Sequence, residues 1–167
     1  MHDSDTNIPK DLMLSNEQIQ HFKEQGYLVI PRLIDNEAIN HYRNIYQDFL
    51  SGKVDTRGFR SDLSGLTKDK NYSGPSQVER ITQIMVVSRL LPTLLQQPIQ
   101  QRCQKVSRQL MGDDMALDMD MLIDKAPFSN TATPWHQDSA YWLKLPDTRA
   151  LSCWVALDEA SIDNGCM

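Results

Sequence analysis

The first clear hydrophobic pattern along the chain is helical. In the segment SNEQIQHFKEQG, residues 15–26, apolar side chains recur three positions apart among polar ones. Ser15 and Gln18 form the pair of a capping box, in which each side chain binds a backbone N–H of the first helical turn. Gly26 suits the left-handed position at which many helices stop. The pattern therefore predicts a short helix between these two ends.

The same kind of pattern returns over residues 35–52. Asp35 is a typical N-terminal cap and Gly52 a typical stop. The apolar face is made by residues three and four positions apart: Ile39, Tyr42, Tyr46 and Phe49. Two further stretches, 92–97 and 98–112, begin with proline and are also predicted to be helical.

Other stretches alternate between apolar and polar residues, as a strand with one buried face does. Residues 115–125 alternate most clearly, and 149–160 alternate as well, with Trp154 and Cys153 on opposite faces. In the first stretch the predicted inner face consists of Met115, Leu117, Met119, Met121 and Ile123. The apolar run 27–30 is predicted to be a buried strand, whereas 77–87 fits a strand or a short helix equally well.

The order of these elements predicts the organisation of the chain. Residues 1–14 are expected to be a polar tail, and 15–167 one domain with helices first and strands later, which is an α+β fold. Residues 51–76 have no periodicity and are rich in Gly, Ser, Asp and Lys, so they are expected to be a flexible loop. A mobile flap over a site and a surface insert are equally good interpretations of this loop.

Composition narrows the possible partners. The net charge is −5 and the basic residues are scattered, so neither nucleic acid nor a membrane surface is expected as a partner. The apolar runs are far shorter than the roughly 20 residues that span a membrane. The three cysteines are widely spaced, without a zinc motif or a disulfide framework, and the start of the chain is unlike a signal peptide. A cytoplasmic protein with reduced thiols is therefore expected.

One of the four histidines is followed two positions later by a carboxylate, in the segment TPWHQDSAYW. On a strand, His136 and Asp138 would point to the same side, so both could bind one metal ion. With a second histidine they would form the 2-His-1-carboxylate arrangement of non-haem Fe(II) oxygenases, which leaves positions open for cosubstrate and dioxygen. The spacing alone is a weak signal, and a histidine hydrogen-bonded to its neighbour is the simpler interpretation.

The surrounding motifs strengthen the metal interpretation. The segment MLIDKAPFSNTATPWHQDSAYW, followed by ALSCWVALDEASIDNGC, resembles the phytanoyl-CoA dioxygenase family of Fe(II)- and 2-oxoglutarate-dependent oxygenases. The resemblance is specific over about the last 50 residues and looser in the helical first half. It implies part of a double-stranded β-helix of the jelly-roll or cupin-like kind, incomplete at the C-terminus.

The resemblance also implies roles for individual residues. His136 and Asp138 would bind Fe(II), and three positions would lie around 2-oxoglutarate: Gln137, Met121 and Trp154. Met121 and Trp154 are equally well read as core residues, and strict alternation would point Gln137 away from the metal, so a local twist or bulge is needed. Tyr141 and Trp142 would form walls of a substrate pocket, although half-buried strand aromatics are as common.

The implied reaction is hydroxylation of an aliphatic C–H in a small organic substrate, with O2 consumed and succinate and CO2 formed. Related halogenases replace the carboxylate ligand, so Asp138 favours hydroxylation. The family's distal histidine and its 2-oxoglutarate-binding arginine have no counterpart in the sequence, so the isolated chain is expected to show negligible turnover. The alternative hypothesis is a non-catalytic remnant that acts as a binding or interaction module.

Overall fold

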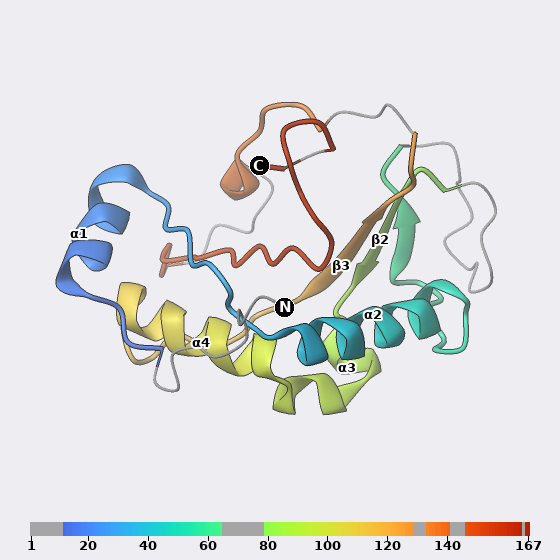
Figure 1. The fold of residues 1–167 in the computed structure, drawn as a ribbon, viewed down its shortest axis with the longest axis horizontal. Coiled ribbons are helices and arrows are strands. Elements are labelled where there is room, and N and C mark those ends of the chain that lie inside the picture. Colours follow the sequence, from blue (N-terminus) through green and yellow to red (C-terminus); the bar gives the residue numbers. More distant parts are fainter. Residues whose placement is uncertain (1–11, 65–78, 129–132, 141–145, 165) are drawn as a thin grey trace, which may run out of the picture.

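The computed structural model describes residues 12–64, 79–128, 133–140, 146–164 and 166–167. Helices dominate the first part of the chain, and a small sheet lies beside them (Figure 1). In chain order the elements are α1 (Asn16–Gln25), α2 (Asn36–Leu50), β1 (Arg60–Asp62), β2 (Ile81–Met85), α3 (Val87–Leu90), the 3-10 helix η1 (Pro92–Gln96), α4 (Pro98–Met111), β3 (Met121–Lys125) and the 3-10 helix η2 (Asp138–Ala140). The predicted α+β class is confirmed.

The helix ends follow the local signals in the sequence. Ser15 and Gln18 form the capping box of α1, and Gly26 ends the helix in the left-handed conformation with φ +79°. The Asp35 side chain accepts a hydrogen bond from the backbone N–H of Ala38 and so caps α2. These predictions are confirmed, because capping depends only on residues within one turn of each other.

The two predicted stretches that begin with proline are also helical, with one difference, whereas α3 and η2 were not predicted. Helix α4 ends at Met111, directly before Gly112, as its sequence indicates. The stretch that begins at Pro92 is a 3-10 helix and not an α-helix. Its short length explains this, because tight i→i+3 turns are common in pieces of a few residues between longer elements.

The sheet is antiparallel, in the order β1-β2-β3. Residues 81–85 are a strand, which decides between the two interpretations of 77–87. Strand β1 lies within the predicted loop 51–76, and the part of that loop from residue 65 to 76 lies outside the described residues.

The hydrophobic core lies between α2 and one face of this sheet. Tyr42 and Phe49 of α2 are buried against Ile84 and Leu122, which are paired neighbours on β2 and β3. Ile34, Val87 and Leu94 complete the buried cluster. The predicted apolar face of α2 is therefore confirmed, since it is the face that covers the sheet.

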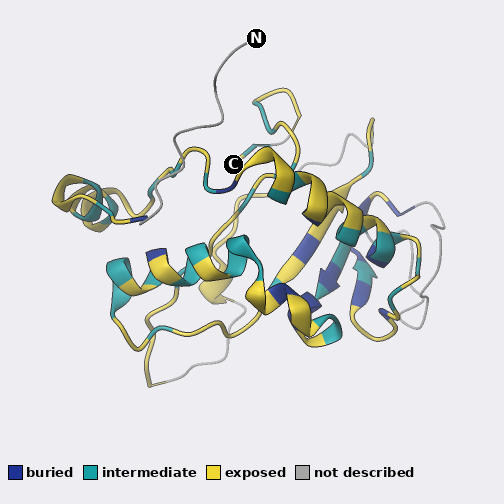
Figure 2. Cartoon of the chain, turned by 60° about the horizontal axis from the view of Figure 1, so that its bottom comes forward, coloured by how far each residue is buried: buried dark blue, intermediate teal, exposed yellow. Residues whose placement is uncertain are grey.

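The predicted inner face of residues 115–125 is wrong. Leu122 is fully buried, whereas 46% of Ile123 is exposed, and Figure 2 shows one buried position between exposed ones on β3. Leu117, Met119 and Met121 are exposed as well. Alternation shows only that neighbours point to opposite sides, and α2 covers the side that carries Leu122. The regular strand is also shorter, since it begins at Met121.

Two other predicted strands are not formed. Residues 27–30 have no strand partner in the described structure, and Tyr27 and Val29 are exposed. Residues 149–160 also carry no strand ladder among the described residues, although Trp154 is exposed and Leu157 packs against the core. A strand forms only beside another strand that takes up its backbone hydrogen bonds. Alternation of apolar and polar residues in the sequence does not provide that partner.

Two further observations bear on the class of protein. None of the described helices has the length and apolar character needed to cross a membrane. The described sheet has three strands, so the double-stranded β-helix stays a prediction.

Candidate metal site

His136 and Asp138 are brought together at the start of η2. The distance from His136 Nε2 to Asp138 Oδ1 is 3.3 Å. The two residues lie on a loop that enters a 3-10 turn and not on a strand, so the geometric reason that the sequence suggested for their proximity is wrong. Both side chains remain open to solvent, with 44% and 53% of their surface exposed.

A backbone carbonyl orients the imidazole. His136 Nδ1 lies 2.8 Å from the carbonyl oxygen of Pro134. A carbonyl oxygen only accepts hydrogen bonds, so Nδ1 must carry the proton and donate it. In the neutral ring this leaves the Nε2 lone pair on the side of Asp138, which is the arrangement in which metal-binding histidines are usually held.

In this tautomer, the contact joins two atoms that are both hydrogen-bond acceptors. A lone pair on Nε2 and a carboxylate oxygen 3.3 Å apart attract each other only if a proton or a cation lies between them. Two ligands bound at right angles, each about 2.1 Å from a metal ion, are about 3.0 Å apart. The observed separation therefore fits neighbouring ligands of one metal ion, and it fits an ion pair with protonated histidine equally well.

No cluster of three or more His, Cys, Asp and Glu residues that could hold a metal ion exists among the described residues. His21 and His41 lie on α1 and α2, where each is near a tyrosine ring. Within the described part of the chain, two side chains of the types that bind metal ions are thus brought together here, and not three.

The other predicted site residues lie on separate elements. Gln137 is exposed beside the pair, and its backbone carbonyl accepts from the N–H of Ala140. Met121 opens β3 on the uncovered face of the sheet, where its sulfur accepts from Gln83 Nε2. Trp154 is half exposed on the segment after η2. No hydrogen bond or ion pair between described residues links Met121 or Trp154 to His136 and Asp138, and Tyr141 and Trp142 lie outside the described residues.

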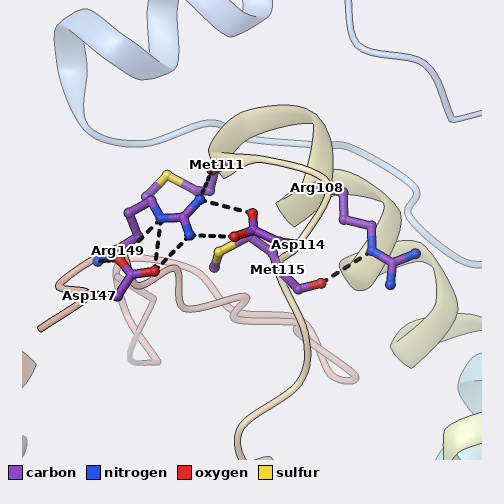
Figure 3. A network of polar contacts seen from close by, with 6 residues as sticks. All are labelled: Arg108, Met111, Asp114, Met115, Asp147 and Arg149. Carbon is purple, nitrogen blue, oxygen red and sulfur yellow. Dashed lines mark hydrogen bonds and ion pairs between the residues drawn. The ribbon is translucent and has the colours of Figure 1, made fainter. Parts of the chain in front are cut away.

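The segment that carries Trp154 is held by a network that the sequence patterns do not reveal (Figure 3). We call residues 146–158 the strap. The Arg149 guanidinium donates to both carboxylate oxygens of Asp114, at 2.9 and 2.6 Å, and to the carbonyl of Met111 at the end of α4. It also binds Asp147 within the strap. The Asp-x-Arg spacing suggests only the local contact, because the partner Asp114 is far away in the sequence.

The far end of the strap has two anchors of its own. Leu157 packs against the core cluster, and Asp158 pairs with Arg43 of α2 at 2.7 Å. The strap is therefore tied at one end to α4 and at the other to α2, and these contacts set the position of Trp154 between them.

Gly112 is expected to be essential for this network. Its φ of +123° favours glycine, and a Cβ there would lie 2.9 Å from Asp114 Oδ1 and 3.0 Å from Arg149 Nη1. We expect Gly112→Ala to lower the free energy of unfolding by about 1–3 kcal/mol in urea denaturation. Gly26→Ala is the matched control, because Gly26 also has a positive φ but has open space around it. Gly112→Ala should also alter the titration of Asp147, which is described next, whereas Gly26→Ala should not. If both changes affect that titration equally, Gly112 does not have this role.

The Arg149 network also predicts an acid-sensitive contact. Hydrogen bonds from the Arg149 side chain lower the pKa of Asp147 to about 2, and they lower the pKa of Asp114 as well. Because the folded-state pKa of Asp147 is below the unfolded value of about 3.9, its stabilising effect is present above about pH 4 and is lost as the pH falls towards 2.

We expect Arg149→Gln to return the Asp147 carboxyl to titration near pH 4, measured by NMR of its carboxyl carbon. Lys53→Gln, which removes one positive charge from the separate Lys53–Asp48 pair, is the control and should leave the Asp147 titration unchanged. If the titration of Asp147 is unaltered in the Arg149 variant, a group other than Arg149 lowers the pKa of Asp147.

Comparison with known proteins identifies the family. The family model described as phytanoyl-CoA dioxygenase (PhyH) matches residues 22–167. The bovine peroxisomal phytanoyl-CoA dioxygenase is 27% identical over 165 residues, which cover 93% of this chain and 46% of that protein. The human protein of the same name is 26% identical over 166 residues, with the same coverage of each chain.

A bacterial relative carries a different name. The ectoine dioxygenase of Bordetella bronchiseptica is 23% identical over 164 residues, which cover 91% of this chain and 47% of that protein. The chain thus spans about half the length of the curated relatives it matches. No solved structure gives a significant match. The family model matches most of the length of this chain, which shows that the chain belongs to the phytanoyl-CoA dioxygenase family.

Proposed function

We propose that this chain is part of an Fe(II)- and 2-oxoglutarate-dependent dioxygenase in which His136 and Asp138 are metal ligands. The observation that carries the proposal is the 3.3 Å separation of His136 Nε2 and Asp138 Oδ1, with Nδ1 held by the Pro134 carbonyl. The names of the relatives support an oxygenase, and the ligand types support a non-haem iron site.

In the proposed reaction, the side chains of this protein bind the metal ion and orient the groups around it. Bound Fe(II), together with 2-oxoglutarate and O2, supplies the oxidation of an aliphatic C–H, with succinate and CO2 as co-products. The hydrogen bond to Pro134 fixes the orientation of the imidazole and leaves Nε2 as the atom that would bind the cation, and the Asp138 carboxylate adds the negative charge that favours a divalent cation. Retention of Asp138 as a ligand favours hydroxylation over halogenation.

The proposal assigns Gln137, Met121 and Trp154 to the surroundings of 2-oxoglutarate. Met121 and Trp154 have exposed surface available for a ligand, in contrast to the fully buried Leu122. The strap holds Trp154 through contacts at both of its ends, which would limit how far the indole moves. Tyr141 and Trp142 are proposed as walls of the substrate pocket because they directly follow the ligand segment.

The substrate is proposed to be a small organic molecule. Two relatives are named for phytanoyl-CoA and ectoine, which differ greatly in size and polarity, so membership of the family defines the reaction more closely than the substrate. The proposal includes a cytoplasmic location, as the sequence suggests, although the mammalian relatives are named as peroxisomal.

A thermal-shift experiment tests the metal site. We expect Mn(II), as a redox-stable substitute for Fe(II), together with 2-oxoglutarate to raise the melting temperature of the chain by a few degrees, because a ligand that binds only the folded state stabilises it. His136→Ala and Asp138→Ala should each abolish the rise. His41→Ala is the matched control, since His41 is an exposed histidine on α2 and should leave the rise intact.

The same experiment separates the alternative function. A non-catalytic binding module is favoured by the uncovered apolar face of the β3 region, where Leu117, Met119 and Ile123 are exposed. That function predicts no rise in melting temperature with Mn(II) and 2-oxoglutarate in the unmodified chain. A rise that survives His136→Ala would show that the cation binds elsewhere.

A further inference from the structure

Two cysteines that are far apart in the sequence meet between α4 and the strap. Cys103 lies in α4 and Cys153 in the strap, and the two thiols are close enough for each to shift the pKa of the other. Both are free thiols, Cys103 half-buried and Cys153 exposed. The third cysteine, Cys166, is near the end of the chain, where its backbone N–H binds the carbonyl of Ser161.

The anchors of the strap account for this meeting. Arg149 fixes the start of the strap at Met111, the last residue of α4, and at Asp114 just beyond it. From Gly112 back to Cys103 the helix rises about 13 Å, and from Arg149 to Cys153 an extended chain covers about 13 Å. The strap runs beside α4 in the opposite direction (Figure 1), so the two thiols come level with each other.

The environment makes the two thiols chemically unequal. The hydrogen bond from Cys103 lowers the pKa of the Cys153 thiol, because it stabilises the thiolate. The same contact, together with burial, raises the pKa of Cys103. Cys153 is also the exposed thiol, so a small disulfide reaches it first, and the half-buried Cys103 is the neighbour within reach of it.

We propose that Cys103 and Cys153 form a reversible intrachain disulfide, with a low-molecular-weight disulfide such as oxidised glutathione as the oxidant. The Cys153 thiolate attacks one sulfur of that disulfide, and one glutathione leaves as its thiolate. Cys103 then loses its proton and attacks Cys153 Sγ, which releases the second glutathione. Two protein thiols are oxidised and one small disulfide is reduced to two thiols, so the exchange is balanced.

The bond would fasten the middle of the strap directly to α4. It would close a covalent loop that contains β3, His136 and Asp138, and it would hold the residue next to Trp154. In a compartment that is normally reducing, such a bond forms only while conditions are temporarily oxidising. The disulfide rests on the thiol contact and the strap anchors, and so does not depend on the proposed metal site.

Peptide mapping of the full chain tests the proposal. After treatment with oxidised glutathione we expect an intact mass lower by two hydrogen atoms than that of the reduced chain. After alkylation of the remaining thiols we expect a Cys103–Cys153 cross-linked peptide and an alkylated Cys166. Cys166→Ser should behave in the same way. Cys103→Ser should instead accumulate a glutathione adduct on Cys153, because the resolving thiol is missing.

A second measurement does not depend on cross-linking chemistry. Oxidation should raise the melting temperature of the unmodified chain and of Cys166→Ser, and a dithiol reductant should reverse the rise. Cys153→Ser, at an exposed position, should fold normally and show no rise. A cross-link that involves Cys166, or glutathione adducts on both Cys103 and Cys153 without a bond between them, would overturn the proposal.

Discussion

Replacing Glu79 by Ala is expected to lower the free energy of unfolding by about 3–5 kcal/mol, because it breaks a fully buried ion pair. The Arg60 and Glu79 side chains are only 2% and 3% exposed. The Glu79 carboxylate accepts from Arg60 Nε and Nη2, at 2.8 to 3.1 Å, and from the Thr82 hydroxyl at 2.6 Å. Its removal leaves a guanidinium inside the protein without this carboxylate.

Arg60 also explains why the pair is where it is. The guanidinium donates to the carbonyl of Leu50, the last residue of α2, while its backbone belongs to β1. It therefore joins the C-terminal end of the helix, which carries partial negative charge, to the sheet that the helix covers. The loss of Glu79 would weaken the packing of α2 on β1 and β2 as well as the ion pair itself.

Urea denaturation at neutral pH measures the effect. Lys53→Ala is the control, since it removes an exposed ion pair with Asp48 and should cost less than about 1 kcal/mol. If Glu79→Ala does not fold, Glu79→Gln keeps the size and one acceptor and should give an intermediate loss. A loss no greater than that of the Lys53 variant would show that the buried pair contributes nothing.

The second large effect is expected at Leu122. Leu122→Ala should lower the free energy of unfolding by about 2–5 kcal/mol, because the fully buried side chain leaves a cavity beside Ile84 and Phe49. Ile123→Ala, one position away on the uncovered face, should cost less than about 1 kcal/mol. Leu122→Met, which conserves volume, should cost less than about 1.5 kcal/mol.

This pair of neighbours decides which face of β3 is inside. A larger loss for Ile123→Ala than for Leu122→Ala would restore the face that alternation in the sequence predicted. The expected order follows instead from the packing of α2, which covers the Leu122 side.

The predictions from sequence divide according to the distance between the residues concerned. The caps at Ser15 and Asp35 and the stop at Gly26 were predicted correctly, since each depends on a hydrogen bond or a backbone angle within one helical turn. The proximity of His136 and Asp138 was also predicted, although the reason given was a strand and the structure has a 3-10 turn.

The contacts that carry the strap could not be predicted in this way. Nothing local in the sequence relates Arg149 to Asp114 or Cys103 to Cys153, because each pair is formed only when the strap lies along α4. The same is true of Arg60 on β1 and Glu79, which precedes β2, because their side chains meet only when the two strands pair. Ion pairs and thiol contacts carry no periodicity that would reveal a distant partner.

The sequence by itself determined the α+β class, the ends of α1, α2 and α4, the proximity of His136 and Asp138, and the family. Each of these depends on neighbouring residues or on a motif that is contiguous in the chain. Only the tertiary structure decided which face of β3 is buried, which apolar runs find strand partners, and where the strap is anchored. Burial and pairing are properties of two surfaces in contact, and the second surface comes from a distant part of the chain.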